Sequence, residues 1–392
     1  IRESVLRAGN EFHASGQCAR RSSDSVVFSQ RMASDQETLA WLSLGLIAEL
    51  TPTGLRKLLA ALSTPQSICA ADRATLASVV PDSVAAAIVR GADPQRLDAA
   101  QRWLEDPANR IVTFADDAYP RLLLEIHDPP PLLYVKGNPA LLDHASLAVV
   151  GSRNATQQGR SNAEAFAREL SEGGFTIISG LALGIDAAAH TGGLAALSSS
   201  IAVVGTGLDI VYPARNRGLA HRLAEAGALV SEFALGTPAL ASNFPRRNRL
   251  ISGLARGCLV VEAALKSGSL ITARAALDQG REVFAVPGSI HSPLSKGCHL
   301  LIKQGAKLAE SSQDILEELG ATIHDRGSAI ASVDEIAPDH PLLDALGFDP
   351  IDLDTLCQRS GLTPDTASAM LLTLELAGVV SRLPGGKFQR MR

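Results

Sequence analysis

Small residues, hydroxyls and cations gather in three segments of the central part of the chain. Two of them, Gly151-Ser152-Arg153 and Ser179-Gly180-Leu181-Ala182-Leu183-Gly184, follow short apolar runs. The third is Phe244-Pro245-Arg246-Arg247-Asn248-Arg249. Glycine lets a backbone approach an anion closely, hydroxyls and amides donate hydrogen bonds, and the planar guanidinium of arginine binds phosphate through two donors. These residue types therefore predict a phosphate-binding surface.

The third segment adds an aromatic ring to its cations. Arginines can follow a sugar-phosphate backbone while a ring stacks on a base, which is how single strands are held without sequence preference. A solvated basic turn is the alternative. No acid occurs from Phe233 to Val261, whereas surface charge usually mixes signs, so the composition favours a nucleic-acid contact.

Two further segments are expected to complete the surface. Ser267-Gly268-Ser269 places small hydroxyl residues after Lys266, and Lys296-Gly297 supplies another basic turn. Both follow apolar runs of the kind that form buried strands.

Asp186 and His190 stand one helical turn apart behind the second segment. Asp186 can cap a helix and His190 can hydrogen-bond to it, so both are expected to be structural or capping residues. Direct contact with a ligand stays open. To act as a general acid–base pair, these two residues would need a nucleophile or a metal ion beside them. The sequence shows neither, so no catalytic residue is assigned.

Short apolar runs alternate with amphipathic stretches through the central region. Continuous apolar strands separated by helices indicate a parallel sheet covered on both faces, which is an extended Rossmann-like, doubly wound α/β fold. In such a sheet the loops at the carboxyl ends of the strands form the ligand site. The predicted strands are Leu147–Val150, Thr176–Ser179, Ile201–Val204, Ala228–Ser231, Leu259–Val261 and Val283–Val286.

Changes of pattern divide the chain into five parts. Residues 1–33 lack an apolar period and are predicted to be a disordered extension, and residues 34–110 have helical spacing of leucines. Residues 111–322 form the Rossmann domain, and 323–340 a polar linker. Residues 341–392 show the pattern of a winged helix. Its second long helix carries Asp365 and Glu375 but no Arg or Lys, so this module is expected to bind protein or to pack within the chain.

The 392 residues carry a formal net charge of −5, which argues against a protein that coats duplex DNA. Acids are absent, however, from four long central stretches, so the central region can still attract an anion. These stretches are residues 144–163, 187–208, 233–261 and 283–309.

Several common chemistries lack their motifs. No phosphate loop, dinucleotide fingerprint or metal-binding cluster occurs, and Gly205-Thr206-Gly207 lacks the third glycine of the fingerprint. Neither a cofactor nor a metal is therefore expected. The five cysteines form no C-x-x-C pair, and no apolar run is long enough to cross a bilayer, so the sequence predicts a cytoplasmic protein with reduced thiols and no membrane contact.

In their order and spacing these segments resemble the DNA-processing protein A (DprA, or Smf) family. The resemblance extends over residues 121–309 and includes Tyr212-Pro213 and Ile251-Ser252. The flanking parts resemble the sterile-alpha-motif-like and winged-helix domains of longer members.

The resemblance implies a homodimer that binds single-stranded DNA, protects it and delivers it to the RecA recombinase during natural transformation, without catalysis. Two alternatives remain. One is a Rossmann-fold enzyme that binds nucleotides or cleaves nucleoside monophosphates, although its P-G-G-x-G-T-x-x-E motif is absent. The other is an adaptor that acts through its flanking domains.

Overall fold

The computed structural model describes residues 36–320, 341–383 and 385–391. Packing divides these residues into an N-terminal unit, 36–117 with 128–134, and a second unit formed by 118–127 and the residues from 135 onward. The predicted extension (1–33) and linker (323–340) lie outside the described residues. Within them, no helix is both long and apolar enough to cross a membrane.

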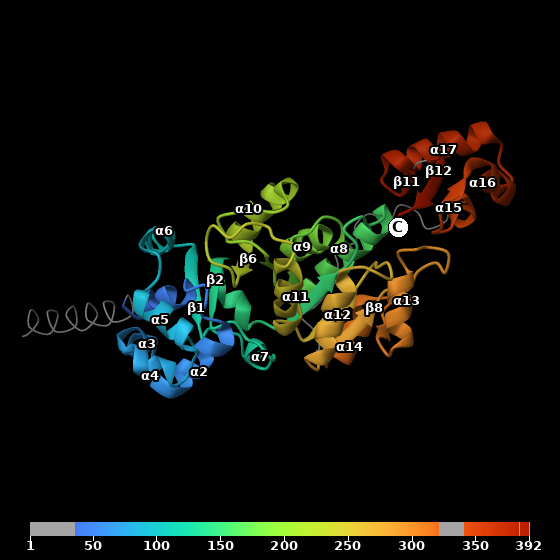
Figure 1. Cartoon of the computed structure of the whole chain (residues 1–392). Helices are drawn as coiled ribbons and strands as arrows, with labels where there is room; N and C mark the ends of the chain where they lie inside the picture. Colours follow the sequence, from blue (N-terminus) through green and yellow to red (C-terminus); the bar gives the residue numbers. More distant parts are fainter. Residues whose placement is uncertain (1–35, 321–340, 384, 392) are drawn as a thin grey trace, which may run out of the picture. The chain divides into compact units, whose positions relative to one another are not determined.

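The N-terminal unit is mainly helical (Figure 1). A helix over residues 36–45 precedes α2 (Pro52–Leu62), whose first turn is capped by Thr51, where the leucine spacing is interrupted. Leu42, Leu58 and Leu76 are fully buried in this unit. The remaining elements are α3 (Pro65–Ala70), α4 (Arg73–Ala77), α5 (Asp82–Arg90), α6 (Pro94–Leu104) and β1 (Asn109–Thr113).

The second unit is built around a parallel sheet, as the sequence predicts. The strand β2 (Leu132–Gly137), which was not predicted from the sequence, begins among the residues of the N-terminal unit and ends among those of the second unit. The parallel strands have the order β6-β5-β4-β3-β7-β8-β9. They are β3 (Ser146–Val150), β4 (Thr176–Ser179), β5 (Ser200–Val203), β6 (Ala228–Ser231), β7 (Gly257–Val260), β8 (Glu282–Ala285) and β9 (Lys307–Leu308).

Helices cover both faces of this sheet (Figure 1). Every residue of β3 is buried, because Leu147 and Val149 pack with Phe166 and Ala189 of one helical layer while alternate residues face the other side. The helices are α7 (Arg121–Leu124), α8 (Gln157–Glu172), α9 (Ile185–Leu194), α10 (Arg217–Ala226), α11 (Asn243–Gly253), α12 (Ser269–Asp278), α13 (Lys296–Lys303) and α14 (Ser312–Glu318), with short 3-10 turns η1 (Pro139–Asp143) and η2 (Ala214–Asn216).

The strand order reverses at β3. From β3 the chain continues to β4 on one side, whereas β7, which follows much later, pairs with the opposite edge of β3. The loops after β3 and β7 consequently diverge at their carboxyl ends and leave a crevice, which is where doubly wound sheets bind ligands.

The C-terminal module has its own core and a three-stranded antiparallel sheet, in the order β10-β12-β11. This arrangement confirms the winged-helix prediction. Its elements are α15 (Pro341–Leu346), β10 (Ile351–Asp352), α16 (Leu353–Ser360), α17 (Pro364–Leu376), β11 (Val380–Leu383) and β12 (Lys387–Arg390).

Candidate functional site

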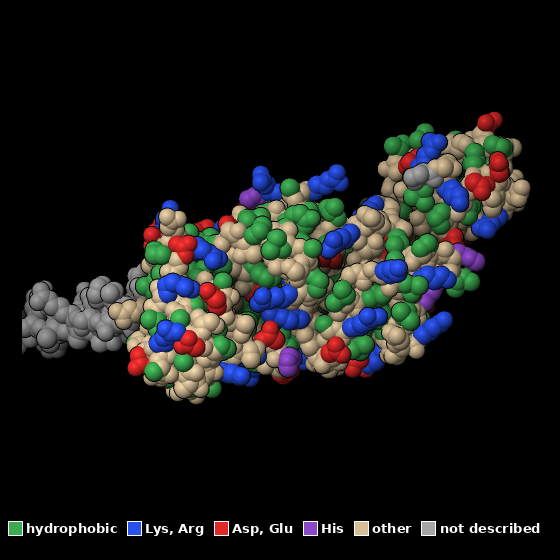
Figure 2. Space-filling model, viewed as in Figure 1, with side chains coloured by type: hydrophobic (Ala, Val, Ile, Leu, Met, Phe, Trp, Pro, Cys, Tyr) green, Lys and Arg blue, Asp and Glu red, His purple; other side chains and the backbone are tan. Residues whose placement is uncertain are grey.

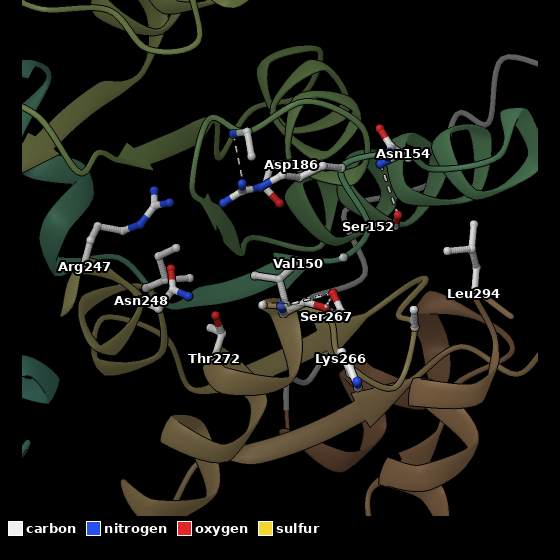
Figure 3. Close-up of a pocket in the computed structure, with 17 residues that line it drawn as sticks. Val150, Ser152, Asn154, Asp186, Arg247, Asn248, Lys266, Ser267, Thr272 and Leu294 are labelled. Carbon is white, nitrogen blue, oxygen red and sulfur yellow. Dashed lines mark hydrogen bonds between the residues drawn. The ribbon is translucent and has the colours of Figure 1, made fainter. Parts of the chain in front are cut away.

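A pocket of about 500 Å³ occupies the crevice between the loops that follow β3 and β7. In Figure 3, Ser152 and Asn154 lie on one side of it and Lys266 and Ser267 on the other. The residues named at this pocket by sequence reasoning are Gly151, Ser152, Arg153, Ala182, Asp186, Arg247, Asn248, Ser267, Gly268 and Ser269. We call this the main pocket.

The loop after β3 requires its small residues. A Cβ on Gly151 would lie 2.6 Å from Cγ1 of Ile185, so no larger residue fits there. Ser152 accepts a hydrogen bond from the backbone amide of Asn154 through Oγ (3.1 Å) and from that of Ile185 through its carbonyl (3.1 Å). The loop is therefore held in place from both sides.

Arg153 is the exposed cation of this loop. Its guanidinium lies 5.7 Å from the centre of the Phe244 ring. No carboxylate among the described residues forms an ion pair with it. Arg153 thus keeps its donors available to an anion, while the ring holds its position.

The segment Ser179–Gly184 wraps around the buried carboxylate of Asp186. Asp186 Oδ2 accepts hydrogen bonds from the backbone amides of Gly180 (3.1 Å) and Ala182 (3.3 Å). Gly184 has φ of 79°, and a Cβ there would lie 2.3 Å from the Ser152 carbonyl oxygen. The Ser179 hydroxyl donates to the carbonyl of Val149 within the sheet (2.7 Å). Most polar groups of this segment therefore shape the loop.

His190 is fully buried and contacts other groups than the expected Asp186. Its Nε2 accepts from the Leu181 amide (3.3 Å), and its Nδ1 lies 2.7 Å from Ser200 Oγ. Because the Ser200 hydroxyl itself donates to the Ile177 carbonyl, Nδ1 carries the proton. Burial lowers the pKa of His190 to about 3, so the ring is neutral.

The basic segment Phe244–Arg249, which was not predicted to be helical, lies in the first half of helix α11. Successive residues of a helix point in directions about 100° apart, so its three arginines cannot share one environment. Arg246 and Arg249, three residues apart, lie on the same side of the helix, whereas Arg247 points away from them.

Arg247 is buried beneath the main pocket and only 4% exposed. Its guanidinium donates to the carbonyl of Gly180 (2.7 Å) and to that of Val203. Burial lowers the pKa of Arg247 to about 10, with the charge of Asp186 opposing the shift, so it remains protonated at neutral pH. Burial raises the pKa of Asp186, while Arg247 and the two loop amides oppose that rise. Arg247 therefore supports the Ser179–Gly184 loop from below.

Arg246 and Arg249 bind the same buried carboxylate, Glu232. Their guanidinium groups lie 3.0 Å and 2.6 Å from Glu232 Oε2. Glu232 immediately precedes the stretch without acids that begins at Phe233. The absence of acids within that stretch therefore did not reveal this pairing. Arg246 remains half exposed and lies over the Phe233 ring.

A smaller pocket of about 80 Å³ adjoins the main pocket and shares Arg153, Ala182 and Arg247 with it. Its wall includes Phe244 and Tyr212, whose ring centres are 5.6 Å apart. The site thus places apolar ring surface beside a polar, cationic pocket.

The loop after β7 supplies the opposite wall of the main pocket. Ser267 and Ser269 exchange a hydrogen bond between their hydroxyls (2.7 Å) at the start of α12. Lys266 borders the pocket and forms no ion pair among the described residues. Lys266 and Asn154 were not among the predicted site residues. The signal for Lys266 was its position, directly before the hydroxyl residues at the end of a parallel strand.

Lys296 and Gly297 do not line the main pocket, although Leu294, two residues before Lys296, does. Gly297 packs against Ala263, whose carbonyl oxygen would be 2.5 Å from an added Cβ. Lys296 is exposed and borders a separate, mainly apolar pocket of about 580 Å³. The structure therefore does not bring this turn together with the other predicted site residues.

Acidic and metal-ligating groups are sparse around the site. Across the described part of the chain, no group of three or more His, Cys, Asp or Glu side chains could hold a metal ion. The main pocket contains Arg153, Lys266 and Arg247 against the single carboxylate of Asp186. This balance suits an anionic ligand.

Comparison with known proteins identifies two matching family models. The one described as DNA recombination-mediator protein A matches residues 110–320, and the one described as DprA winged helix domain matches residues 327–386. Among relatives, protein Smf of Escherichia coli is 45% identical over 304 residues, covering 76% of this chain and 81% of its own. DNA processing protein DprA of Streptococcus pneumoniae is 49% identical over 203 residues, covering 52% and 72% respectively.

Two solved structures are similar to this one. The X-ray structure of DNA processing protein A from Streptococcus pneumoniae has a TM-score of 0.63 at 39% identity and covers 69% of this chain and 94% of its own. DNA processing protein A from Helicobacter pylori, whose structure is described for its single-stranded DNA binding mode, has a TM-score of 0.50 at 30% identity, covering 55% and 98%.

Proposed function

The chain belongs to the DNA recombination-mediator protein A family, and we propose from this membership and from the site geometry that it binds single-stranded DNA at the carboxyl edge of its parallel sheet. It would protect the strand and deliver it to the RecA recombinase during natural transformation. We propose that it acts in the cytoplasm as a homodimer and does not catalyse a reaction.

One observation carries the proposal. Arg153, an exposed cation without a carboxylate partner in the described structure, lies against the Phe244 ring at the junction of the two pockets. A phosphate can bind the guanidinium while a base stacks on the aromatic surface, and this combination holds an unpaired strand without reading its sequence. The related Helicobacter pylori protein is described as binding single-stranded DNA.

The proposed contacts differ in kind. Phosphate would meet Arg153, Lys266 and the small-residue loops, and bases would meet Phe244. The main-pocket residues that would meet phosphate are Gly151, Ser152, Ser267, Gly268 and Ser269, with Asn248 of α11 and with Ala182, whose amide already donates to Asp186. Arg246 adds a half-exposed cation along the same helix.

A second set of residues would support these contacts from beneath. These residues already form hydrogen bonds, an ion pair or a close backbone contact within the protein. They are Ser179, Gly180, Gly184, Arg247 and Arg249. We assign Lys296 and Gly297 no place in the main pocket.

Absence of catalysis is inferred from how the titratable groups are used. Asp186 accepts hydrogen bonds from two loop amides, and both ring nitrogens of His190 have partners. Neither group is poised to move a proton to or from a ligand.

Fluorescence anisotropy with labelled oligo-dT over a salt series tests the proposal. The logarithm of the association constant should fall by about 0.7 per phosphate contact for each tenfold rise in salt. Arg153→Ala should weaken binding, whereas Arg256→Ala, at an exposed cation before the amino end of β7, should not. Equal affinity for duplex and single strands would contradict the stacking. Release of free base from nucleoside monophosphates would instead favour the enzyme alternative.

A further inference from the structure

Three exposed arginines and a histidine gather at η2 and α10, outside both pockets. They are Arg215, Arg217, His221 and Arg222, and we call them the α10 basic surface. Figure 2 shows blue and purple side chains standing over α10. None of the four forms an ion pair or a side-chain hydrogen bond within the described structure.

Several other arginines of the same unit have acidic partners, which the α10 basic surface lacks. Arg168 binds Glu164, Arg281 binds Glu125, and Arg246 and Arg249 bind Glu232. On α10 the one acid, Glu225, lies in the last turn and forms no ion pair with the arginines. The local charge is therefore strongly positive.

The arrangement also works against the stability of the helix. Arg217 is the first residue of α10, where a cation meets the positive end of the helix dipole, and Arg215 lies in the turn before it. Neither position is balanced by an acid in the first turn. Cations in this position are better explained by an external anion than by folding.

A buried side chain fixes this surface to the candidate site. Asn216, between Arg215 and Arg217, is 8% exposed, and its Nδ2 donates to the carbonyls of Leu181 (2.8 Å) and Ala182 (3.1 Å). Ala182 lines both pockets, and Tyr212, three residues before Arg215, lines the smaller one. Ala220 and Leu223 hold α10 against the sheet. The arginines thus begin where the smaller pocket ends.

We propose that the α10 basic surface is a second binding surface for the phosphodiester backbone of a single strand, where the strand leaves the smaller pocket past Tyr212. The inference rests on the proposed function, because it takes the occupant of the pockets to be part of that strand. Arg215 and Arg217 meet the nearest phosphates. Arg222 lies five residues further along α10, about 7 Å at the helical rise, and meets a later one.

The geometry predicts that the surface affects long strands only. A strand that just fills the pockets does not reach α10, whereas a longer strand does. Removing one phosphate-binding cation should reduce the salt slope by about 0.7, which corresponds to roughly fivefold weaker binding at about 0.1 M salt.

The test compares Arg215→Ala/Arg217→Ala with the charge-matched pair Arg168→Ala/Arg256→Ala in the full chain. Affinity is measured for oligo-dT of roughly 4, 8 and 16 nucleotides, the range of site sizes of single-strand grooves. The first variant should bind the shortest strand normally and the longer strands at least fivefold more weakly, with a smaller salt slope. The matched pair should bind all three as the parent does. Adding Arg222→Ala should cause a further loss with the longest strand.

Two outcomes would overturn the inference. In the first, Arg215→Ala/Arg217→Ala binds the longest strand as the parent does, while Arg153→Ala loses binding. The strand would then bind at the pockets and not at the α10 basic surface. A loss that is equal at every length would place these arginines in the pockets themselves. If instead Arg153→Ala binds every strand as the parent does, the proposed function fails, whatever the α10 variants show.

Discussion

The loop after β3 and the first turns of α11 both bring an arginine to the same pocket, and the two arginines have opposite environments. Arg153 is exposed, lies against a ring and forms no ion pair within the described structure. Arg247 is buried, and its guanidinium donates to two backbone carbonyls. One cation is available to a ligand, and the other fixes the loop that the ligand would contact.

The difference shows that residue type and proximity to a pocket do not define a binding residue. Nη1 of Arg247 donates to two backbone carbonyls, and a phosphate that took this nitrogen would leave those buried carbonyls without its hydrogen bonds. Substitutions at the two positions should therefore change different measured quantities.

The largest effect is expected for Arg247→Ala. Loss of the guanidinium leaves the carbonyls of Gly180 and Val203 without a donor and the buried Asp186 without its compensating charge. Removal of one partner from such a buried arrangement costs about 3–5 kcal/mol. Urea unfolding should show this loss in the free energy of unfolding. A parent-like unfolding midpoint would mean that Arg247 does not support the loop.

His190 should make stability depend on pH. Its pKa is about 3 in the folded protein, against 6.5 for the free side chain, so between these values the unfolded chain binds the extra proton. The contribution of neutral His190 is present above pH 6.5 and is lost as the pH falls toward 3, with a slope of up to about 1.4 kcal/mol per pH unit.

The His190→Gln variant isolates this contribution. It should be less stable near neutral pH but lose stability less steeply on acidification, because the titrating ring is absent. Urea unfolding at several pH values between about 4 and 7 measures both slopes. Asp186 remains in both proteins, so its own titration cancels in the difference to first order. Parallel slopes would show that His190 is already protonated in the fold.

Arg153→Ala should change binding rather than stability. Removal of this one phosphate-binding cation corresponds to a salt slope lower by about 0.7 and to roughly fivefold weaker binding at about 0.1 M salt. Because no described carboxylate pairs with Arg153, the urea midpoint should match that of the parent. Anisotropy and unfolding measured on the same preparation separate this variant from Arg247→Ala, and a shared loss of stability would erase the contrast between them.

The smallest effect is expected in the winged-helix module. Its helix α17 carries Asp365 and Glu375 and no Arg or Lys, so it offers phosphate no cation. The double variant Arg382→Ala/Lys387→Ala, in the adjacent hairpin, should lower the affinity for a single strand less than Arg153→Ala does. A drop as large as that of Arg153→Ala would bring this module into the DNA-binding surface.

The chemistry of the loops and the class of fold could both be read from residue order. Buried parallel strands are continuous apolar runs, and β4 and β6 begin and end at the predicted residues. Gly151 and Gly184 were predicted as residues that let the backbone approach an anion, and the structure adds a packing reason, because an added Cβ would meet Ile185 at one position and the Ser152 carbonyl at the other. The strands β2 and β9 escaped prediction, since one follows three prolines and the other has two residues.

Which charges are free was decided by the tertiary structure. Arg249 and Glu232 are 17 residues apart, and Arg247 reaches a carbonyl 67 residues earlier in the chain. Local patterns follow from the backbone geometry of neighbouring residues, whereas pairing between distant charges depends on how helices pack on the sheet. The sequence by itself therefore determined where the candidate site lies on the sheet, and packing determined that Arg153 faces the solvent while Arg247 supports the loop.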